Sequence, residues 1–186
     1  MVNSCEALLD FKTLPKDQLF DPLCVKLEPA TVYEKSYVNP EEKNANNCCR
    51  VLFAHCQRRD HKEAAVLNIL HGILKEPFFN QLRTQEQLGY IVQCSQQSIG
   101  HMLHLTFLVQ SSHKDPDFLE SRINAFLEAH RAILPTQEQV DKLKQAAIAE
   151  LSQKPKSLYE EMNRNWNFIL DEYDFDHREK VIKLLE

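Results

Sequence analysis

The chain has 186 residues, which is enough for one domain with a full hydrophobic core but would cramp two. Hydrophobic residues at 43% and charged residues at 26% are typical of a globular domain, and the formal net charge of -5 argues against nucleic acid as the main partner. No apolar run approaches the roughly 20 residues of a membrane span, so we expect no membrane partner.

The first part of the chain predicts an entry segment followed by two strands. Residues 1–28 mix helix-like and turn-like signals, which Pro15 and Pro22 interrupt. The β-branched and aromatic run at 31–38 predicts one strand. The run at 48–56 predicts a second strand, which is apolar on both faces and is therefore expected to be covered on both.

The central part predicts a helix, a sharp turn and a hairpin. Apolar residues recur at helical spacing and indicate a helix over 61–83. Gly89 would supply the backbone freedom for a sharp exit from this helix into a strand at 90–98. Gly100 marks a hairpin turn, and the alternation that follows predicts a half-buried antiparallel strand at 101–110.

Each of the remaining predicted helices begins with a capping signal. Asp115 precedes a proline at the first helical position, and Thr136 and Ser157 each begin a sequence with the spacing of a capping box. The helices are predicted at 116–134, 137–152 and 157–171. The order of elements predicts an α+β fold, an antiparallel sheet with helices packed mainly on one face.

The histidines form no zinc motif. A catalytic zinc helix needs two histidines one turn apart with a glutamate between them, and neither H-E-x-x-H nor H-x-x-E-H occurs. His61 precedes Glu63 on the first predicted helix, but position 65 is alanine. We therefore predict no metal site in this chain.

The six cysteines sit at irregular spacings without a C-x-x-C pair. This pattern favours reduced thiols in a cytosol-like compartment, so we expect a cytoplasmic location. An independent thiol enzyme stays open as an alternative, and it would require one cysteine of low pKa. Cys94 and the neighbours His55 and Cys56 are the candidates by residue type alone.

The stretch NQLRTQEQLGYIVQC joins the predicted helix to a strand and places Arg83 and Tyr90 on either side of Gly89. A structural interpretation has Arg83 covering the helix end, Gly89 capping it, and Tyr90 on the core face with Val92 and Cys94. A functional interpretation has an arginine and a phenol on rigid elements gripping peptide carbonyls. Residue types alone leave both open.

The same stretch resembles the arginine–tyrosine segment in the C-terminal half of the pitrilysin/insulinase family, the inverzincin zinc metallopeptidases. Further likeness lies in FLESRINAFLE, QKPKSLYEE and YDFDHREK, so that the resemblance covers roughly residues 45–180. In this family two homologous halves close around a peptide chamber, and the first half binds zinc through H-x-x-E-H. The resemblance implies that Arg83 and Tyr90 bind substrate opposite the zinc, with Gly89 as a structural hinge.

The resemblance further implies a function for the whole chain. Residues 1–186 would be a single, incomplete C-terminal domain that walls the substrate chamber of a zinc metalloendopeptidase or oligopeptidase. Its partners would be short to medium peptides and the N-terminal catalytic half of the same protein, which holds the zinc. The chain itself would carry no catalytic residue and be inactive alone. The alternative is a noncatalytic structural or interaction domain of the same fold, and an exposed edge or apolar patch would promote homo-oligomers.

Overall fold

The computed structural model describes residues 15, 18, 28–38, 40, 46–54, 60–99, 102–170 and 175–186. Its elements are β1 (Asn47–Ala54), α2 (His61–Phe79), the π-helix η3 (Asn80–Gln85), β2 (Ile91–Ile99), β3 (Met102–Ser111), α3 (Pro116–Arg131), α4 (Gln137–Leu151), α5 (Leu158–Leu170) and α6 (His177–Leu185). The predicted α+β class is confirmed. No helix in the described ranges is long and apolar enough to cross a membrane.

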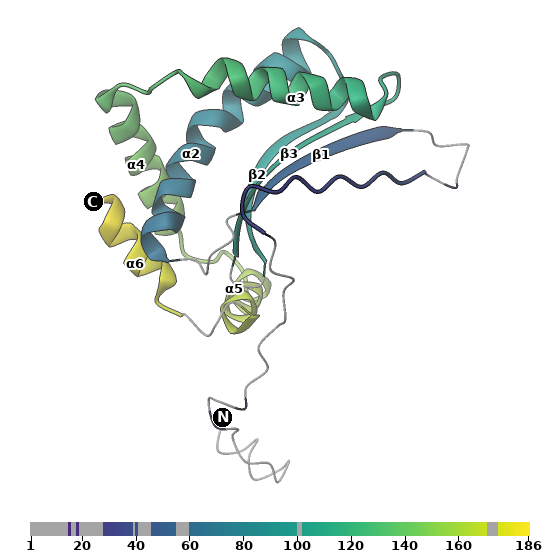
Figure 1. Cartoon of the computed structure of the whole chain (residues 1–186). Helices are drawn as coiled ribbons and strands as arrows, with labels where there is room; N and C mark the ends of the chain where they lie inside the picture. The colour runs from purple at the N-terminus through teal and green to yellow at the C-terminus, as the bar shows by residue number, and fades with distance from the viewer. Residues whose placement is uncertain are drawn as a thin grey trace.

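The sheet is antiparallel and has the strand order β1-β3-β2 (Figure 1). β3 therefore lies in the middle and pairs with both other strands. Ile99 is opposite Met102, which confirms the predicted hairpin, although its turn residues Gly100 and His101 lie outside the described ranges.

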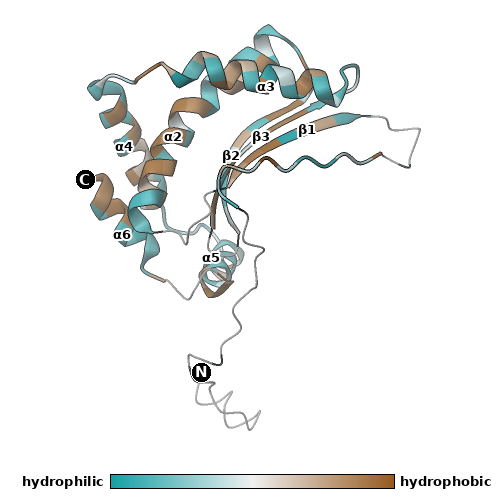
Figure 2. Ribbon diagram, viewed as in Figure 1, coloured by the Kyte–Doolittle hydropathy of each residue, from teal (hydrophilic) through white to brown (hydrophobic). Residues whose placement is uncertain are grey.

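Two helices cover one face of this sheet. α2 packs against β2 and α3 against β1, while α4 and α6 pack on the side of α2 that faces away from the sheet (Figure 1). Figure 2 shows hydrophobic residues along the strands and along these helices, as expected where layers meet.

The centre of the core is a cluster of three phenylalanines from three elements. Phe78 of α2, Phe107 of β3 and Phe126 of α3 are fully buried. The ring of Phe78 lies edge-on to the other two, with centroid distances of 5.1 Å to Phe107 and 5.2 Å to Phe126. Edge-to-face packing adds stability beyond burial, so this cluster ties both helices to the same face of the sheet.

The helix starts follow the capping signals in the sequence. The Thr136 hydroxyl accepts from the backbone N–H of Gln139, whose side chain accepts from the backbone N–H of Thr136, a complete capping box. Asp115 caps α3 in the predicted way. At α5 only half of the box forms, because the carboxylate of Glu160 accepts from the backbone N–H of Lys156 instead of that of Ser157.

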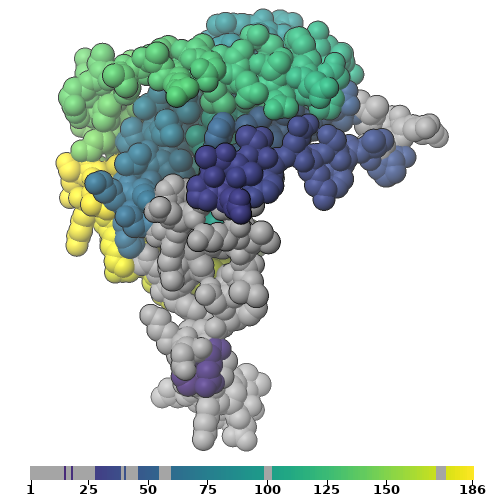
Figure 3. Space-filling view, in the orientation of Figure 1, coloured from purple at the N-terminus to yellow at the C-terminus, as the bar shows by residue number. Residues whose placement is uncertain are grey.

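Two strand predictions are corrected. Residues 31–38 are outside the sheet and lie on the surface in Figure 3. Val32 and Val38 are each more than nine-tenths exposed. The prediction that strand 48–56 is covered on both faces is also wrong. β1 is an edge strand whose helix-facing residues contact the core, while Leu52 on the other face is exposed. β-propensity located β1 but not the environment of either segment, because burial depends on neighbours that a local pattern does not contain.

The C-terminal helices differ from the sequence-based expectation in packing. α6 was not predicted, yet it buries Val181 and Leu185 against α2. α5 has no buried residue, and its Leu158, Met162 and Trp166 are more than half exposed. Homo-oligomerisation through an exposed apolar surface stays a prediction.

Candidate functional site

The helix that carries Arg83 continues without a break past a proline. Pro77 lies inside α2, which passes directly into the π-helix η3. At its end the backbone N–H of Glu86 donates to the carbonyl of Gln81 at 2.9 Å, the wider spacing of a π-turn. Arg83 is therefore in the last turn of a long, continuous helical element.

The turn after η3 is held to the core by two leucines. Leu82 is fully buried and Leu88 is 3% exposed, and the backbone N–H of Leu88 donates to the carbonyl of Leu82 at 3.0 Å. Between them Gln87 takes a left-handed conformation, with φ of 52°. Burial on both sides leaves this turn little freedom to move.

The structure requires glycine at position 89 for a different reason from the one expected. Its backbone is not in the left-handed region, so Gly89 is not the left-handed residue of this turn; Gln87 is. A Cβ placed on Gly89 would lie 1.7 Å from the carbonyl oxygen of Gln110 in β3. Only glycine lets the chain pass this close to β3. The role of Gly89 as a hinge stays a prediction.

Arg83 and Tyr90 are the two side chains of this turn that come together on the surface. The guanidinium carbon of Arg83 lies 5.7 Å from the centroid of the Tyr90 ring, over its face. Tyr90 is 86% exposed and Arg83 partly exposed. Neither side chain makes a hydrogen bond or ion pair with any residue in the described ranges, so their donors face solvent.

The interpretation of Tyr90 as a core residue is wrong. Val92 and Cys94 are buried, as strand alternation predicts, but β2 begins at Ile91 and Tyr90 lies just before it. The pleat therefore does not determine the direction of its ring. Since little of Tyr90 is removed from water, its phenol contributes little to the core.

The pair has a definite chemical capacity. The cation–π contact is electrostatic, and the N–H groups of Arg83 bond no other residue in the described ranges, so they stay available as donors. The Tyr90 hydroxyl adds an O–H donor. Two adjacent donors, one of them charged, can bind a peptide carbonyl and stabilise negative charge that develops on its oxygen.

A residue that sequence reasoning missed lies inside the same turn. The carboxylate of Glu86 accepts from Nε and Nη2 of Arg122 in α3, both at 2.8 Å, and from the side-chain amide of Gln81 at 2.9 Å. Arg122 holds the pKa of the Glu86 carboxyl below its usual range. The two residues are 36 positions apart, so no local spacing marks this ion pair.

Neither metal nor thiol chemistry has support in the described part of the chain. No group of three or more histidine, cysteine or acidic side chains there could hold a metal ion. Glu63 is the partner of Asp60 in the capping box of α2. Burial raises the pKa of Cys49 and that of Cys94 to about 11, which keeps both thiols protonated. The candidates His55 and Cys56 lie outside the described residues.

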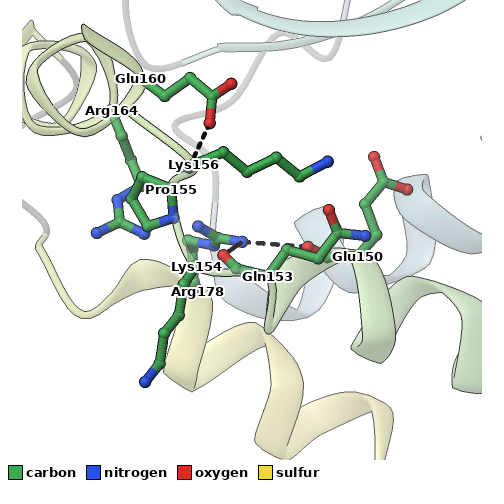
Figure 4. Close-up of a pocket in the computed structure, with 8 residues that line it drawn as sticks. All are labelled: Glu150, Gln153, Lys154, Pro155, Lys156, Glu160, Arg164 and Arg178. Atoms are coloured by element: carbon green, nitrogen blue, oxygen red, sulfur yellow. Dashed lines mark hydrogen bonds between the residues drawn. The ribbon is translucent and has the colours of Figure 1, made fainter. Parts of the chain in front are cut away.

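A basic hollow is found elsewhere, between the end of α4, the start of α5 and the start of α6. It has a volume of about 280 Å³ and is lined by Lys154, Lys156, Arg164 and Arg178 with two glutamates among them (Figure 4). The ring of His177, the first residue of α6, lies 5.2 Å from that of His61, the first residue of α2, at a tilt of 38°. The hollow is thus at the end of α2 opposite to Arg83 and Tyr90, and it is separate from the candidate site.

Comparison with known proteins gives a consistent result. A family model described as "PQQ synthase PqqF-like, C-terminal lobe domain 4" matches residues 69–166, which include Arg83, Glu86, Tyr90 and Arg122. A nardilysin-like protein of Arabidopsis thaliana is 34% identical over 150 residues, covering 76% of this chain and 15% of that protein. A Schizosaccharomyces pombe protein described as a zinc protease is 29% identical over 188 residues, covering 100% of this chain and 19% of that protein.

A solved structure agrees with this result. The crystal structure of pitrilysin aligns with 75% of this chain and 15% of its own length, with a TM-score of 0.60 and 32% sequence identity. The chain thus spans less than a fifth of the length of each of these three relatives.

Proposed function

The chain belongs to the pitrilysin/insulinase family and matches its C-terminal lobe, and from this premise we propose that it is the substrate-binding, zinc-lacking portion of a longer zinc metallopeptidase. Zinc and the activated water would be supplied by the N-terminal half. The substrates would be short to medium peptides. The alternative is a structural or interaction domain of the same fold.

The proposal is carried by the exposed Arg83–Tyr90 pair on a fixed turn. Tyr90 is exposed and Arg83 partly exposed, so both side chains contribute little to folding, whereas their donors are well placed for a ligand. Binding groups work best when rigid elements hold them before the substrate arrives, because less conformational freedom is then lost on binding.

The role of each residue follows from its chemistry. Arg83 would hold a peptide carbonyl in the ground state, since a guanidinium is charged throughout the working pH range. Tyr90 would donate its hydroxyl to the same oxygen as negative charge develops there. No proton transfer is required of either residue. They would bind and orient the peptide for hydrolysis.

The test is a double variant, Arg83→Ala with Tyr90→Phe, in the full-length peptidase. Zinc content and melting temperature should stay at the parent's level while peptide hydrolysis falls by about 10²-fold or more. A control at Tyr159, an exposed tyrosine of α5, changed to phenylalanine should keep full activity. If the double variant hydrolyses peptide normally but melts early or fails to assemble, the structural alternative is correct.

A further inference from the structure

Glu86 lies between Arg83 and Tyr90 and is the most strongly bound side chain of this turn. Its two carboxylate oxygens accept three hydrogen bonds, two of them from the Arg122 guanidinium in a bidentate arrangement. The side chains of Arg122 and Glu86 are only 34% and 21% exposed. A bidentate, partly buried pair is stronger and more directional than an ordinary surface ion pair.

We propose that Glu86 and Arg122 are positioning residues for the peptide contact of Arg83 and Tyr90. In this proposal, which rests on the proposed function, Arg122 fixes the turn to α3. It also keeps the carboxylate of Glu86 away from the guanidinium of Arg83.

The Glu86–Arg122 pair fixes the position of the turn. Leu82 and Leu88 anchor its two ends in the core, and Glu86 is its anchor in the middle. Arg122 is a rigid partner, because the next residue, Ile123, is fully buried and fixes α3 against the sheet. The site thus depends on α3, which itself contributes no side chain to the Arg83–Tyr90 pair.

The pair also sets the charge available next to Arg83. Glu86 follows Arg83 by three positions and caps the end of η3, so its carboxylate and the Arg83 guanidinium belong to the same short turn. A free carboxylate there would pair with Arg83 and compete with a neutral peptide carbonyl, which is the weaker acceptor. Arg122 occupies both carboxylate oxygens, and Arg83 makes no ion pair within the described residues. The charge of Arg83 therefore remains available to a substrate.

The proposal predicts a rescue that ordinary destabilisation would not give. Arg122→Gln frees the Glu86 carboxylate and should lower kcat/KM for peptide hydrolysis ~10-fold, mainly by raising KM, as expected when a binding group is occupied. Glu86→Gln removes the competing charge and should cost only ~3-fold. The Glu86→Gln/Arg122→Gln double variant should recover most of the loss and approach the Glu86→Gln level.

The experiment measures kcat, KM and melting temperature for these three variants in the full-length peptidase, together with Arg83→Ala. Arg131→Gln is the matched control. It removes an arginine from the same helix. The ion pair of Arg131 with Glu128, at 3.7 Å, is longer than that of Arg122 with Glu86, and both of its side chains are more than 70% exposed. It should leave KM and kcat at the parent's level.

Two results would overturn the proposal. One is a double variant with kcat/KM no better than that of Arg122→Gln, even where its melting temperature recovers, because the pair would then be purely structural. The other is an Arg122→Gln variant that behaves like the control. If Arg83→Ala impairs hydrolysis in either case, the proposed function survives; if Arg83→Ala has no effect, the proposed function fails, and this inference with it.

Discussion

Arg83 and Tyr90 come from different elements, one from the end of a π-helix and one from the residue before a strand, yet the guanidinium of Arg83 lies over the Tyr90 ring at 5.7 Å. A contact of this kind on the surface is worth about 0.5–1 kcal/mol. It brings the two side chains together, and neither makes a hydrogen bond to another residue in the described ranges.

Tyr90→Phe should separate function from stability. The ring stays, so the contact with Arg83 persists, and the hydroxyl has no partner in the described part of the chain. The free energy of unfolding should change by less than about 1 kcal/mol. Turnover in the full-length peptidase should fall about 10²-fold if the hydroxyl acts mainly in the transition state. Chemical denaturation and steady-state kinetics on one preparation measure both quantities. Early melting with normal turnover would assign Tyr90 to packing.

Arg83→Ala should damage binding as well as turnover. A guanidinium can hold a carbonyl before the reaction begins, so we expect a higher KM and also a lower kcat. Arg83→Lys keeps the charge but loses the forked donor geometry, and it should recover binding only in part. Competition by a non-hydrolysed peptide gives the affinity directly. An unchanged affinity in Arg83→Ala would contradict the role assigned to this side chain.

The sequence was informative wherever a local pattern carried the signal. Helix starts at Asp115 and Thr136 depend on side chains that cap nearby N–H groups, so spacing alone located them. The hairpin was equally predictable. The exposure of residues 31–38 and of the second face of β1 was not predictable, because burial depends on neighbours that are distant in sequence.

The sequence indicated which side chains form the candidate site, but not the contacts that hold them in place. Arg83 and Tyr90 could be selected by resemblance, whereas the exposure of Tyr90 required knowing that β2 begins one residue later. The Glu86–Arg122 pair depends on α3 lying beside the turn, a contact between distant parts of the chain. Gly89 stood out because the chain has few glycines. What requires a glycine there is the carbonyl of Gln110 in β3, which is distant in sequence.

The purified chain should bind no stoichiometric zinc. Zinc sites in proteins need three or four histidine, cysteine or acidic ligands in tetrahedral geometry, and the sequence contains neither zincin motif. Metal analysis after dialysis should give far less than one zinc per chain, and added zinc should not raise the melting temperature. One tightly held zinc per chain would refute this expectation and require ligands outside the described residues.

Gly89→Ala should be much more destabilising than Gly72→Ala. At Gly89 the new methyl group would meet the backbone carbonyl of Gln110, which cannot move without breaking the hairpin pairing. We expect a loss of about 2–4 kcal/mol in the free energy of unfolding. At Gly72, inside α2, the new Cβ would lie 2.9 Å from Cδ2 of Leu143, the end of a flexible side chain. Alanine also gains about 1 kcal/mol there in helix propensity, so the net change should be small. Equal losses at the two sites, measured by urea unfolding, would contradict this reading of Gly89.

Lowering the pH should reduce the free energy of unfolding through protonation of Glu86. Its pKa is lowered in the folded chain from the ordinary value of 4.5, chiefly by the hydrogen bonds from Arg122, so the unfolded chain binds the proton more readily. The stability that this group contributes is therefore fully present above about pH 4.5 and is lost as the pH falls through the lowered value. Because the pair is partly exposed, Glu86→Gln should cost about 1 kcal/mol at pH 7 and progressively less in acid.

The measurement is urea unfolding of the purified parent chain and Glu86→Gln at several pH values from 7 down to 3. The difference between the two proteins should shrink as the pH falls, because protonation of Glu86 in the parent removes the charge that the variant already lacks. Glu138→Gln is the control, since its ion pair with Lys142 is short but more than 70% exposed on both sides, and it should differ little from the parent at any pH. A difference for Glu86→Gln that stays constant down to pH 3 would show that the carboxylate charge does not hold the turn to α3.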